Sequence, residues 1–170
     1  MNSSSIQNAP FTAQCTIPSP LGPLLLARTE LGLAGAWFVE GQKDTPGPLA
    51  APVDPDDPLL LAAAKQLGAY FAGREARFDL PLDLHGTPFQ RSVWQALLDI
   101  GTSQTRSYAD IARQVGSPRA TRAVGAAIGR NPVSVIVPCH RVVGSSGALT
   151  GYSGGMERKR ALLTLEGLAV

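Results

Sequence analysis

The residues best suited to chemistry are Cys139 and His140, neighbours in the stretch VPCHRVVG at positions 137–144 of a chain with two cysteines and two histidines. A thiolate is a good nucleophile, and an imidazole can take the proton that a thiol must lose to become one. Neighbouring residues point to opposite faces of a strand or lie about 100° apart on a helix. Proton transfer between the two side chains is therefore expected to need a water, or a bend at Pro138.

A histidine that works as a base needs a carboxylate that holds its tautomer and stabilises the imidazolium. The candidates in the second half of the chain are Asp99, Asp110, Glu157 and Glu166. Glu166 falls in the last turn of a helix predicted over residues 155–167, where the helix dipole disfavours a negative charge. A charged imidazole as its partner explains that position. The alternatives are that Glu166 is a solvated side chain and that Cys139 is a small, inert core residue.

The first half of the chain predicts a small antiparallel β-meander followed by a helix. Residues 14–39 alternate short apolar runs with glycine and proline, with a turn at 29–32. Residues 41–58 are rich in proline, glycine and aspartate, which indicates a loop. Asp57 then caps a helix with Pro58 at its first position, and the helical pattern runs to Gly73.

Three helices are predicted at the start of the second half. Thr87 and Gln90 form a capping box for a helix that stops at Gly101. Ser107 caps the next helix, which runs from Tyr108 to about Val115. The third helix begins at Ser117-Pro118, covers the stretch RATRAVGAAIGR and stops at Asn131-Pro132.

The second and third of these helices, joined by a glycine-serine-proline corner, resemble a helix-turn-helix. Arg119, Arg122 and Arg130 lie on the third helix, where a nucleic-acid reader carries its basic side chains. Its many alanines and glycines let a backbone approach another surface closely. Tight packing inside an α-helical core is the competing interpretation.

Two further segments surround Cys139. Residues 133–137, VSVIV, are a short β-rich run that Pro138 ends, and we expect it to hold Cys139 rigidly inside the fold. Residues 145–155, SSGALTGYSGG, form a glycine- and serine-rich loop that can fold over a pocket.

Composition limits the class of protein. The 170 residues are 44% hydrophobic, enough to bury a core. Residues 1–85 carry five Lys/Arg against nine Asp/Glu, a net −4, and residues 86–170 carry ten against four, a net +6. A basic half suits a polyanion such as nucleic acid, although many solvated surfaces are also basic. Two cysteines give no disulfide framework, the first ten residues lack a secretory signal, and no apolar stretch could span a membrane. We expect a cytoplasmic protein.

The chain resembles the O6-alkylguanine-DNA alkyltransferases, also called methylated-DNA–protein-cysteine methyltransferases. The resemblance is carried by TPFQRSVWQAL, SYADIA, RATRAVG, NPVSVIVPCHRVVG and GALTGYSGG, in order and followed by a basic helix ending in LEG. It covers roughly residues 86–167. It implies an α/β fold of the α+β kind: a small ribonuclease-like N-terminal domain (1–85) that supports a mainly helical DNA-binding and alkyl-transfer domain (86–170).

The resemblance also implies catalytic roles. Cys139 would take the alkyl group from the base onto its sulfur, once and irreversibly. His140 would act through a water as the base, and Glu166 would orient that histidine and balance its charge. Tyr108 matches a tyrosine that donates a proton to the leaving guanine. Asn131 matches an asparagine that holds the recognition helix against the active-site segment.

For DNA, the resemblance implies a duplex carrying O6-alkylguanine, with O4-alkylthymine left open, bound through the minor groove with the damaged base flipped out. Arg122 matches the arginine that enters the base stack in place of the flipped base. Tyr152 and Ser153 fall in the loop that would line the base pocket. The predicted set of DNA-contacting residues is completed by Ala123, Val142 and Ser145.

No cofactor or metal is expected, because the first half offers only Cys15 and His85 as soft ligands. Cys15 is expected to be a strand residue, although it could echo a transferable thiol. A monomer is the default. Two other functions compete: a module that binds alkylated bases without chemistry and signals to other repair factors, and a cysteine hydrolase. The hydrolase would leave the basic helix unexplained. The binding module would leave the combination of Cys139, His140 and Glu166 unexplained.

Overall fold

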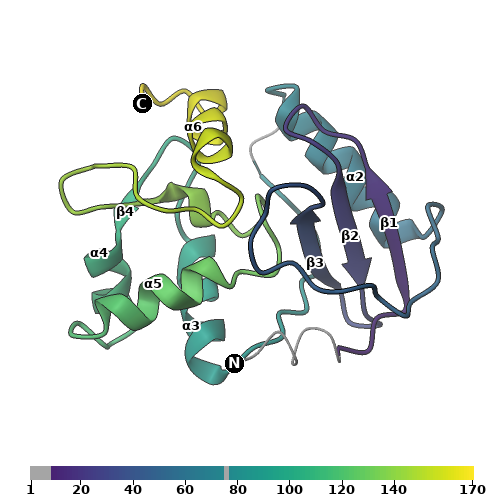
Figure 1. The fold of residues 1–170 in the computed structure, drawn as a ribbon, viewed down its shortest axis with the longest axis horizontal. Helices are drawn as coiled ribbons and strands as arrows, with labels where there is room; N and C mark the ends of the chain where they lie inside the picture. The colour runs from purple at the N-terminus through teal and green to yellow at the C-terminus, as the bar shows by residue number, and fades with distance from the viewer. Residues whose placement is uncertain (1–8, 75–76) are drawn as a thin grey trace.

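The computed structural model describes residues 9–74 and 77–170, so most of the N-terminal stretch considered for a signal (residues 1–8) lies outside it. The N-terminal part is an antiparallel sheet of β1 (Ala13–Ile17), β2 (Leu24–Arg28) and β3 (Leu33–Phe38), in that order. Helix α2 (Pro58–Phe71) covers one face of this sheet (Figure 1). The predicted meander plus helix is confirmed.

Helix α2 begins and packs as its sequence dictates. The Asp57 carboxylate accepts hydrogen bonds from the backbone N–H groups of Leu59 (3.0 Å) and Leu60 (3.1 Å), and Pro58 occupies the first turn, where it costs no hydrogen bond. The residues of its buried face recur every three or four positions: Leu60, Ala63, Leu67 and Tyr70. The helix thus places Tyr70, at its last turn, inside the molecule.

The C-terminal part is mainly helical, as predicted. Its helices are α3 (Pro88–Leu98), α4 (Tyr108–Gln114), α5 (Thr121–Gly129) and α6 (Met156–Leu165). The predicted caps at Thr87 and Ser107 are both present as capping boxes. Two short strands, β4 (Arg106–Ser107) and β5 (Val142–Val143), pair in parallel, and a 3-10 turn, η1 (Cys139–Arg141), precedes β5.

The third predicted helix starts later than the sequence suggested. Residues 117–120 close a turn in which the Ala120 N–H donates to the Ser117 carbonyl oxygen (2.9 Å), and α5 begins only at Thr121, with no side-chain cap. The Ser-Pro signal therefore marks the corner of the helix-turn-helix and not the helix itself. Helices α4 and α5 pack against each other, as that motif requires.

The β-rich run at residues 133–137 forms no strand. It makes a single bridge to the edge of β3, where the Ala36 N–H donates to Pro132 O and the Ser134 N–H donates to Ala36 O (both 2.9 Å). The chain then turns back on itself, with Val135 at a φ of 72°, a strained value for a β-branched residue. Its apolar side chains are buried in the core, which explains their type without a sheet.

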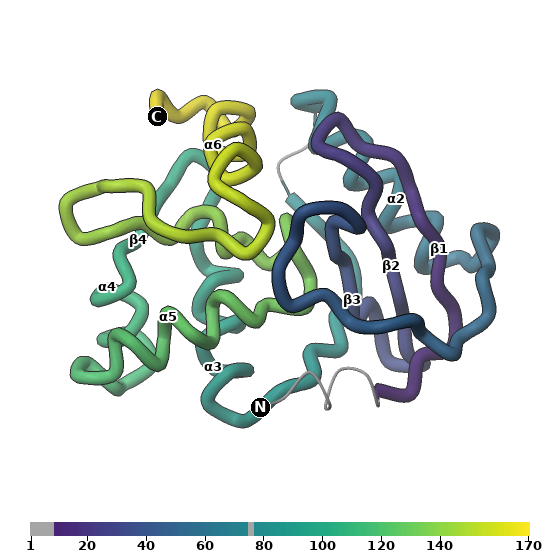
Figure 2. Tube along the Cα trace, in the orientation of Figure 1, coloured from purple at the N-terminus to yellow at the C-terminus, as the bar shows by residue number. Residues whose placement is uncertain are grey.

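The two parts are joined around residues 151–158. The Arg158 guanidinium donates to Leu21 O and to Gly154 O (both 2.9 Å) and lies 4.3 Å over the ring of Phe38. The Lys43 N–H donates to Ser153 O (2.8 Å). Figure 2 shows the resulting path: the loop before α6 runs toward β3 and the loop that follows it.

Neither a helix long and apolar enough to cross a membrane nor a group of three or more potential metal ligands is found in residues 9–74 and 77–170.

Candidate active site

Cys139 opens η1 directly after Pro138 and is 2% exposed. Its Sγ accepts a hydrogen bond from Asn131 Nδ2 (3.1 Å), which also donates to Val137 O (2.8 Å). Asn131 Oδ1 accepts from the Val133 N–H (3.0 Å). Asn131, which follows the end of α5, therefore ties that helix to the segment carrying the cysteine and points a donor at its sulfur.

Burial raises the pKa of the Cys139 thiol, and the hydrogen bond from Asn131 and the positive charge of Lys159 oppose that rise. Lys159 is fully buried, and its Nζ donates to Val142 O (2.6 Å) and Thr150 O (2.9 Å). Burial lowers the pKa of Lys159 to about 8. A thiol whose pKa is raised needs a base before it can attack.

The predicted base, His140, is the next residue in the chain. His140 Nε2 lies 2.7 Å from Glu166 Oε2, and both side chains are buried. Burial lowers the pKa of His140, with the Glu166 carboxylate opposing it. Nδ1 of His140 has no hydrogen-bond partner within the described parts of the chain, so it is available to take a proton, directly or through water. The imidazole favoured here is neutral, as a base must be.

Glu166 is held as a carboxylate. Burial would raise its pKa, but hydrogen bonds from His140 and Arg141 outweigh that effect and lower it to about 2. Arg141 donates through Nε to Glu166 Oε1 (2.8 Å) and through Nη2 to Glu166 Oε2 (3.0 Å). The charge needed to stabilise a protonated His140 is therefore fixed next to it.

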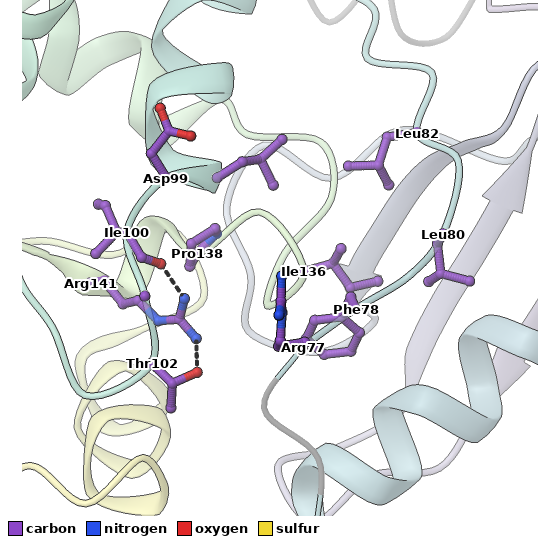
Figure 3. A pocket seen from close by; sticks show the side chains of 12 residues that line it. Arg77, Phe78, Leu80, Leu82, Asp99, Ile100, Thr102, Ile136, Pro138 and Arg141 are labelled. Atoms are coloured by element: carbon purple, nitrogen blue, oxygen red, sulfur yellow. Dashed lines mark hydrogen bonds between the residues drawn. The ribbon is translucent and has the colours of Figure 1, made fainter.

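The far side of the Arg141 guanidinium is also occupied. It donates to Ile100 O (2.6 Å) and Thr102 Oγ1 (3.3 Å), the two bonds drawn in Figure 3. These contacts lie on one wall of a cavity of about 570 Å³ between the two parts of the protein, and Phe78 and Leu80 stand on the opposite wall. Arg141 thus links the end of α3 to the carboxylate behind the cysteine.

On the other side, Cys139 faces a second cavity of about 410 Å³. Tyr108, at the start of α4, accepts a hydrogen bond from Thr150 Oγ1 (3.1 Å) at its rim. The hydroxyl of Tyr152 is buried near Cys139, and burial raises the pKa of Tyr152. The cavity is lined by Tyr108, Gly125, Ile128, Gly129, Cys139, Thr150, Gly151, Tyr152 and Ser153. A lining that combines two tyrosines with three glycines suits a flat heterocycle.

The structure connects all five predicted catalytic residues: Cys139 and Tyr108 line this cavity, Asn131 donates to the Cys139 sulfur, and Glu166 contacts His140, the residue after the cysteine. Of the predicted DNA-contacting residues, Tyr152 and Ser153 line the cavity. Three others are exposed: Arg122 and Ala123 on α5, and Ser145 on the neighbouring loop.

Val142 differs from the other members of the predicted DNA-contacting set. Its side chain is fully buried in β5, and its backbone oxygen accepts the hydrogen bond from Lys159. The apolar type of Val142 reflects core packing, so a contact of this residue with DNA stays a prediction that its side chain does not support.

The sequence reasoning missed Lys159, Arg141 and Tyr70. The first had a visible signal, because Lys159 shares one face of α6 with Leu162, Leu163 and Glu166 and is therefore a lysine at a core position. Arg141 follows directly after His140, and its type alone does not indicate that it is buried against Glu166. Tyr70 lies on the buried face of α2, a position that is typical of a core aromatic.

Two family profiles match successive parts of the chain. Residues 14–84 match the profile of the 6-O-methylguanine DNA methyltransferase ribonuclease-like domain, and residues 88–168 match that of the 6-O-methylguanine DNA methyltransferase DNA binding domain. A methylated-DNA–protein-cysteine methyltransferase of Mycobacterium bovis is 53% identical over 151 residues, covering 89% of this chain and 90% of the relative. That of Methanosarcina barkeri is 49% identical over 152 residues, covering 88% and 94%.

Among solved structures, the fold is similar to that of Mycobacterium tuberculosis OGT in complex with DNA. The TM-score is 0.85 at 51% identity, and the match covers 91% of this chain and 92% of the other.

Proposed function

The chain belongs to the 6-O-methylguanine DNA methyltransferase family and repairs DNA by alkyl transfer, and we propose that Cys139 is the residue that accepts the alkyl group. One observation carries this assignment. The buried sulfur of Cys139 lies at a cavity of about 410 Å³, with the Asn131 amide donating to it and the His140–Glu166 pair next in the chain. No other described cysteine has such surroundings, since Cys15 is a buried residue of β1.

The reaction is a displacement at the alkyl carbon. His140 takes the thiol proton through a water, and the Cys139 thiolate attacks the carbon attached to O6 of the guanine. The new S–C bond forms as the C–O bond breaks, and the electron pair leaves with the guanine. Tyr108, at the rim of the cavity, supplies a proton to that base. Glu166 balances the imidazolium that remains.

The product is a stable thioether. Each molecule is therefore used once. We propose double-stranded DNA carrying O6-alkylguanine as the substrate. A methyl group inside a stacked duplex is out of reach of a buried sulfur, so the base must be flipped into the cavity.

Helix α5 is the proposed DNA-reading element. Arg122 is exposed in its first turn and is placed to fill the gap left by the flipped base. Ala123 and Gly125 keep the helix narrow enough for a close approach to the DNA backbone in the minor groove. Tyr152 and Ser153 would hold the base inside the cavity.

We further propose that the protein acts as a monomer in the cytoplasm, where its DNA substrate and a reducing environment for two free cysteines are found. The division into a supporting part (1–85) and a reactive part (86–170) is supported by the family matches to residues 14–84 and 88–168.

The competing function is a module that binds alkylated bases without chemistry. Transfer of a radiolabelled methyl group from an O6-methylguanine duplex separates the two. Cys139→Ser should take up no label yet still bind the duplex, and Cys15→Ser, the matched control, should take up one label per molecule. Equal labelling of both variants would refute Cys139 as acceptor. Binding without label by the unaltered protein would favour the binding module.

A further inference from the structure

The Glu166 carboxylate has a third side-chain partner that comes from the other part of the protein. Tyr70, in the last turn of α2, donates its hydroxyl hydrogen to Glu166 Oε2 at 2.6 Å, across 96 positions of sequence. The same oxygen accepts from His140 Nε2 (2.7 Å) and Arg141 Nη2 (3.0 Å). The N-terminal part therefore reaches the charge that supports the proposed base.

Tyr70 is fixed for this role. Its side chain is 3% exposed, and its ring packs edge-on against Phe71 (5.4 Å between centroids) and at a tilt against Phe78 (5.5 Å). Phe78 also lines the 570 Å³ cavity behind Arg141 in Figure 3. Burial and the neighbouring carboxylate raise the pKa of Tyr70, so its hydroxyl stays protonated and remains a donor.

A donor to Oε2 has a defined electrostatic effect. A carboxylate oxygen that is shared among several donors is a weaker acceptor for each of them. Tyr70 therefore limits how strongly Glu166 holds a proton on His140. An imidazole bound more tightly by the carboxylate would be protonated more readily and would be a poorer acceptor for the thiol proton.

We propose that Tyr70 is a positioning residue of the alkyl-transfer reaction, acting through Glu166 to orient His140 and keep it neutral. The proposal rests on the roles assigned above to His140 and Glu166. This role gives the N-terminal part a function in the chemistry. Tyr70, Glu166 and His140 form a relay of hydrogen bonds, and the reactive part without α2 would lack the donor that Tyr70 supplies. The other groups that bear on His140 are Arg141 and Lys159, both positively charged, and Glu166 itself.

The test is the pH dependence of single-turnover methyl transfer from an O6-methylguanine duplex, comparing the full-length protein with its Tyr70→Phe variant. That change keeps the ring and its packing and removes only the hydroxyl. We expect the rate at neutral pH to fall about tenfold, as for the loss of one hydrogen bond to a charged group. We expect the acid side of the rate profile to move to higher pH by roughly half a unit, because His140 protonates more readily.

Thr29→Val is the matched control. The Thr29 hydroxyl is equally buried in the N-terminal part and donates to Asp83 Oδ2 (2.5 Å), a carboxylate that makes no contact with Tyr70, Glu166 or His140 among the hydrogen bonds of the described residues. It should lower the melting temperature without moving the pH profile. Titration of the reactive fraction and thermal unfolding of each variant separate misfolding from slow chemistry.

A Tyr70→Phe profile that superimposes on the wild type, or falls uniformly with no shift, would overturn the proposal and leave Tyr70 a structural contact. If the wild-type protein transfers no methyl group to Cys139, the proposed acceptor fails instead, independently of Tyr70.

Discussion

Glu166 occupies the C-terminal cap of α6, where the helix dipole disfavours a negative charge, yet its side chain is buried. The cost is offset by donors from three side chains, His140, Arg141 and Tyr70. Removing a single partner from such a buried charged cluster is strongly destabilising, because it leaves other charges unpaired. The residue that supports the proposed base is therefore also a residue on which folding depends.

Because the Glu166 carboxylate is both charged and buried, we predict that the free energy of unfolding depends on pH. The pKa of Glu166 is about 2 in the folded protein against an ordinary 4.5, so its stabilising effect is present above pH 4.5 and is lost as the pH falls toward 2. The lowered pKa of Glu166 contributes roughly 3 kcal/mol to the free energy of unfolding. Urea unfolding at several pH values should show that the difference in the free energy of unfolding between wild type and Glu166→Gln becomes smaller as the pH falls from 4.5 toward 2. Glu157→Gln, an exposed change on the same helix, should keep a constant gap.

At this scale the residue types mark Cys139, His140 and Glu166 as candidates, and the family resemblance implies their roles together with those of Tyr108 and Asn131. Tyr70 could not be predicted. A tyrosine on the buried face of a helix fits core packing, and its partner is 96 residues away. Only the folded arrangement of the two parts shows where its hydroxyl points.

At the scale of elements, α5 carries the proposed contact to DNA on a short, narrow helix. Its buried face, Val124, Ala127 and Ile128, packs on the rest of the C-terminal part. Trp94 of α3 anchors it further, since its indole N–H donates to Ala127 O (2.8 Å). The opposite face, with Arg122, is left exposed on a rigid support.

Arg122→Ala should therefore leave the fold and the nucleophile intact and impair the use of duplex DNA. Without a side chain to fill the gap in the base stack, the free-energy cost of unstacking the flipped base is no longer offset. We therefore expect about 10- to 100-fold slower transfer from a duplex. Reaction with free O6-methylguanine should be unchanged. Arg74→Ala, an exposed arginine after α2, is the control. Equal losses on duplex and free base would contradict a role in flipping.

The starts of the helices could be predicted where the capping residues and the apolar pattern of the sequence agree. Asp57-Pro58 and the two capping boxes mark helix starts through their own side-chain bonds. The run 133–137 was misleading because valine and isoleucine are typical of both strands and buried turns. Its bridge to Ala36 depends on a strand almost 100 residues earlier in the chain, which no local pattern reveals.

For the whole molecule, the contact between the two parts includes the loop that lines the cavity. Arg158 is the central link, because it bonds to Leu21 and stacks on Phe38 in the N-terminal part while holding Gly154 of the cavity loop. The N-terminal part is thus in contact with both sides of the site: the loop over the cavity, and Glu166 behind the sulfur.

Arg158→Met keeps the aliphatic stem and removes the guanidinium. The loss of its hydrogen bonds should lower the free energy of unfolding by about 2 kcal/mol and the melting temperature by roughly 4 to 8 °C. Methyl transfer should slow as well, because the loop carrying Tyr152 and Ser153 is less well held. Arg160→Met, an exposed neighbour on α6, should change neither quantity. A normal rate despite a lowered melting temperature would separate the interface from the function.

The central claim is that one sulfur receives the alkyl group, once. The most direct measurement is mass spectrometry of the intact protein and its peptides after mixing with an equimolar duplex containing O6-methylguanine. We predict a gain of one methyl group, confined to the peptide with Cys139 and unchanged by excess substrate. A methyl group on Cys15 or on several residues, or tight binding with no change in mass, would contradict the account.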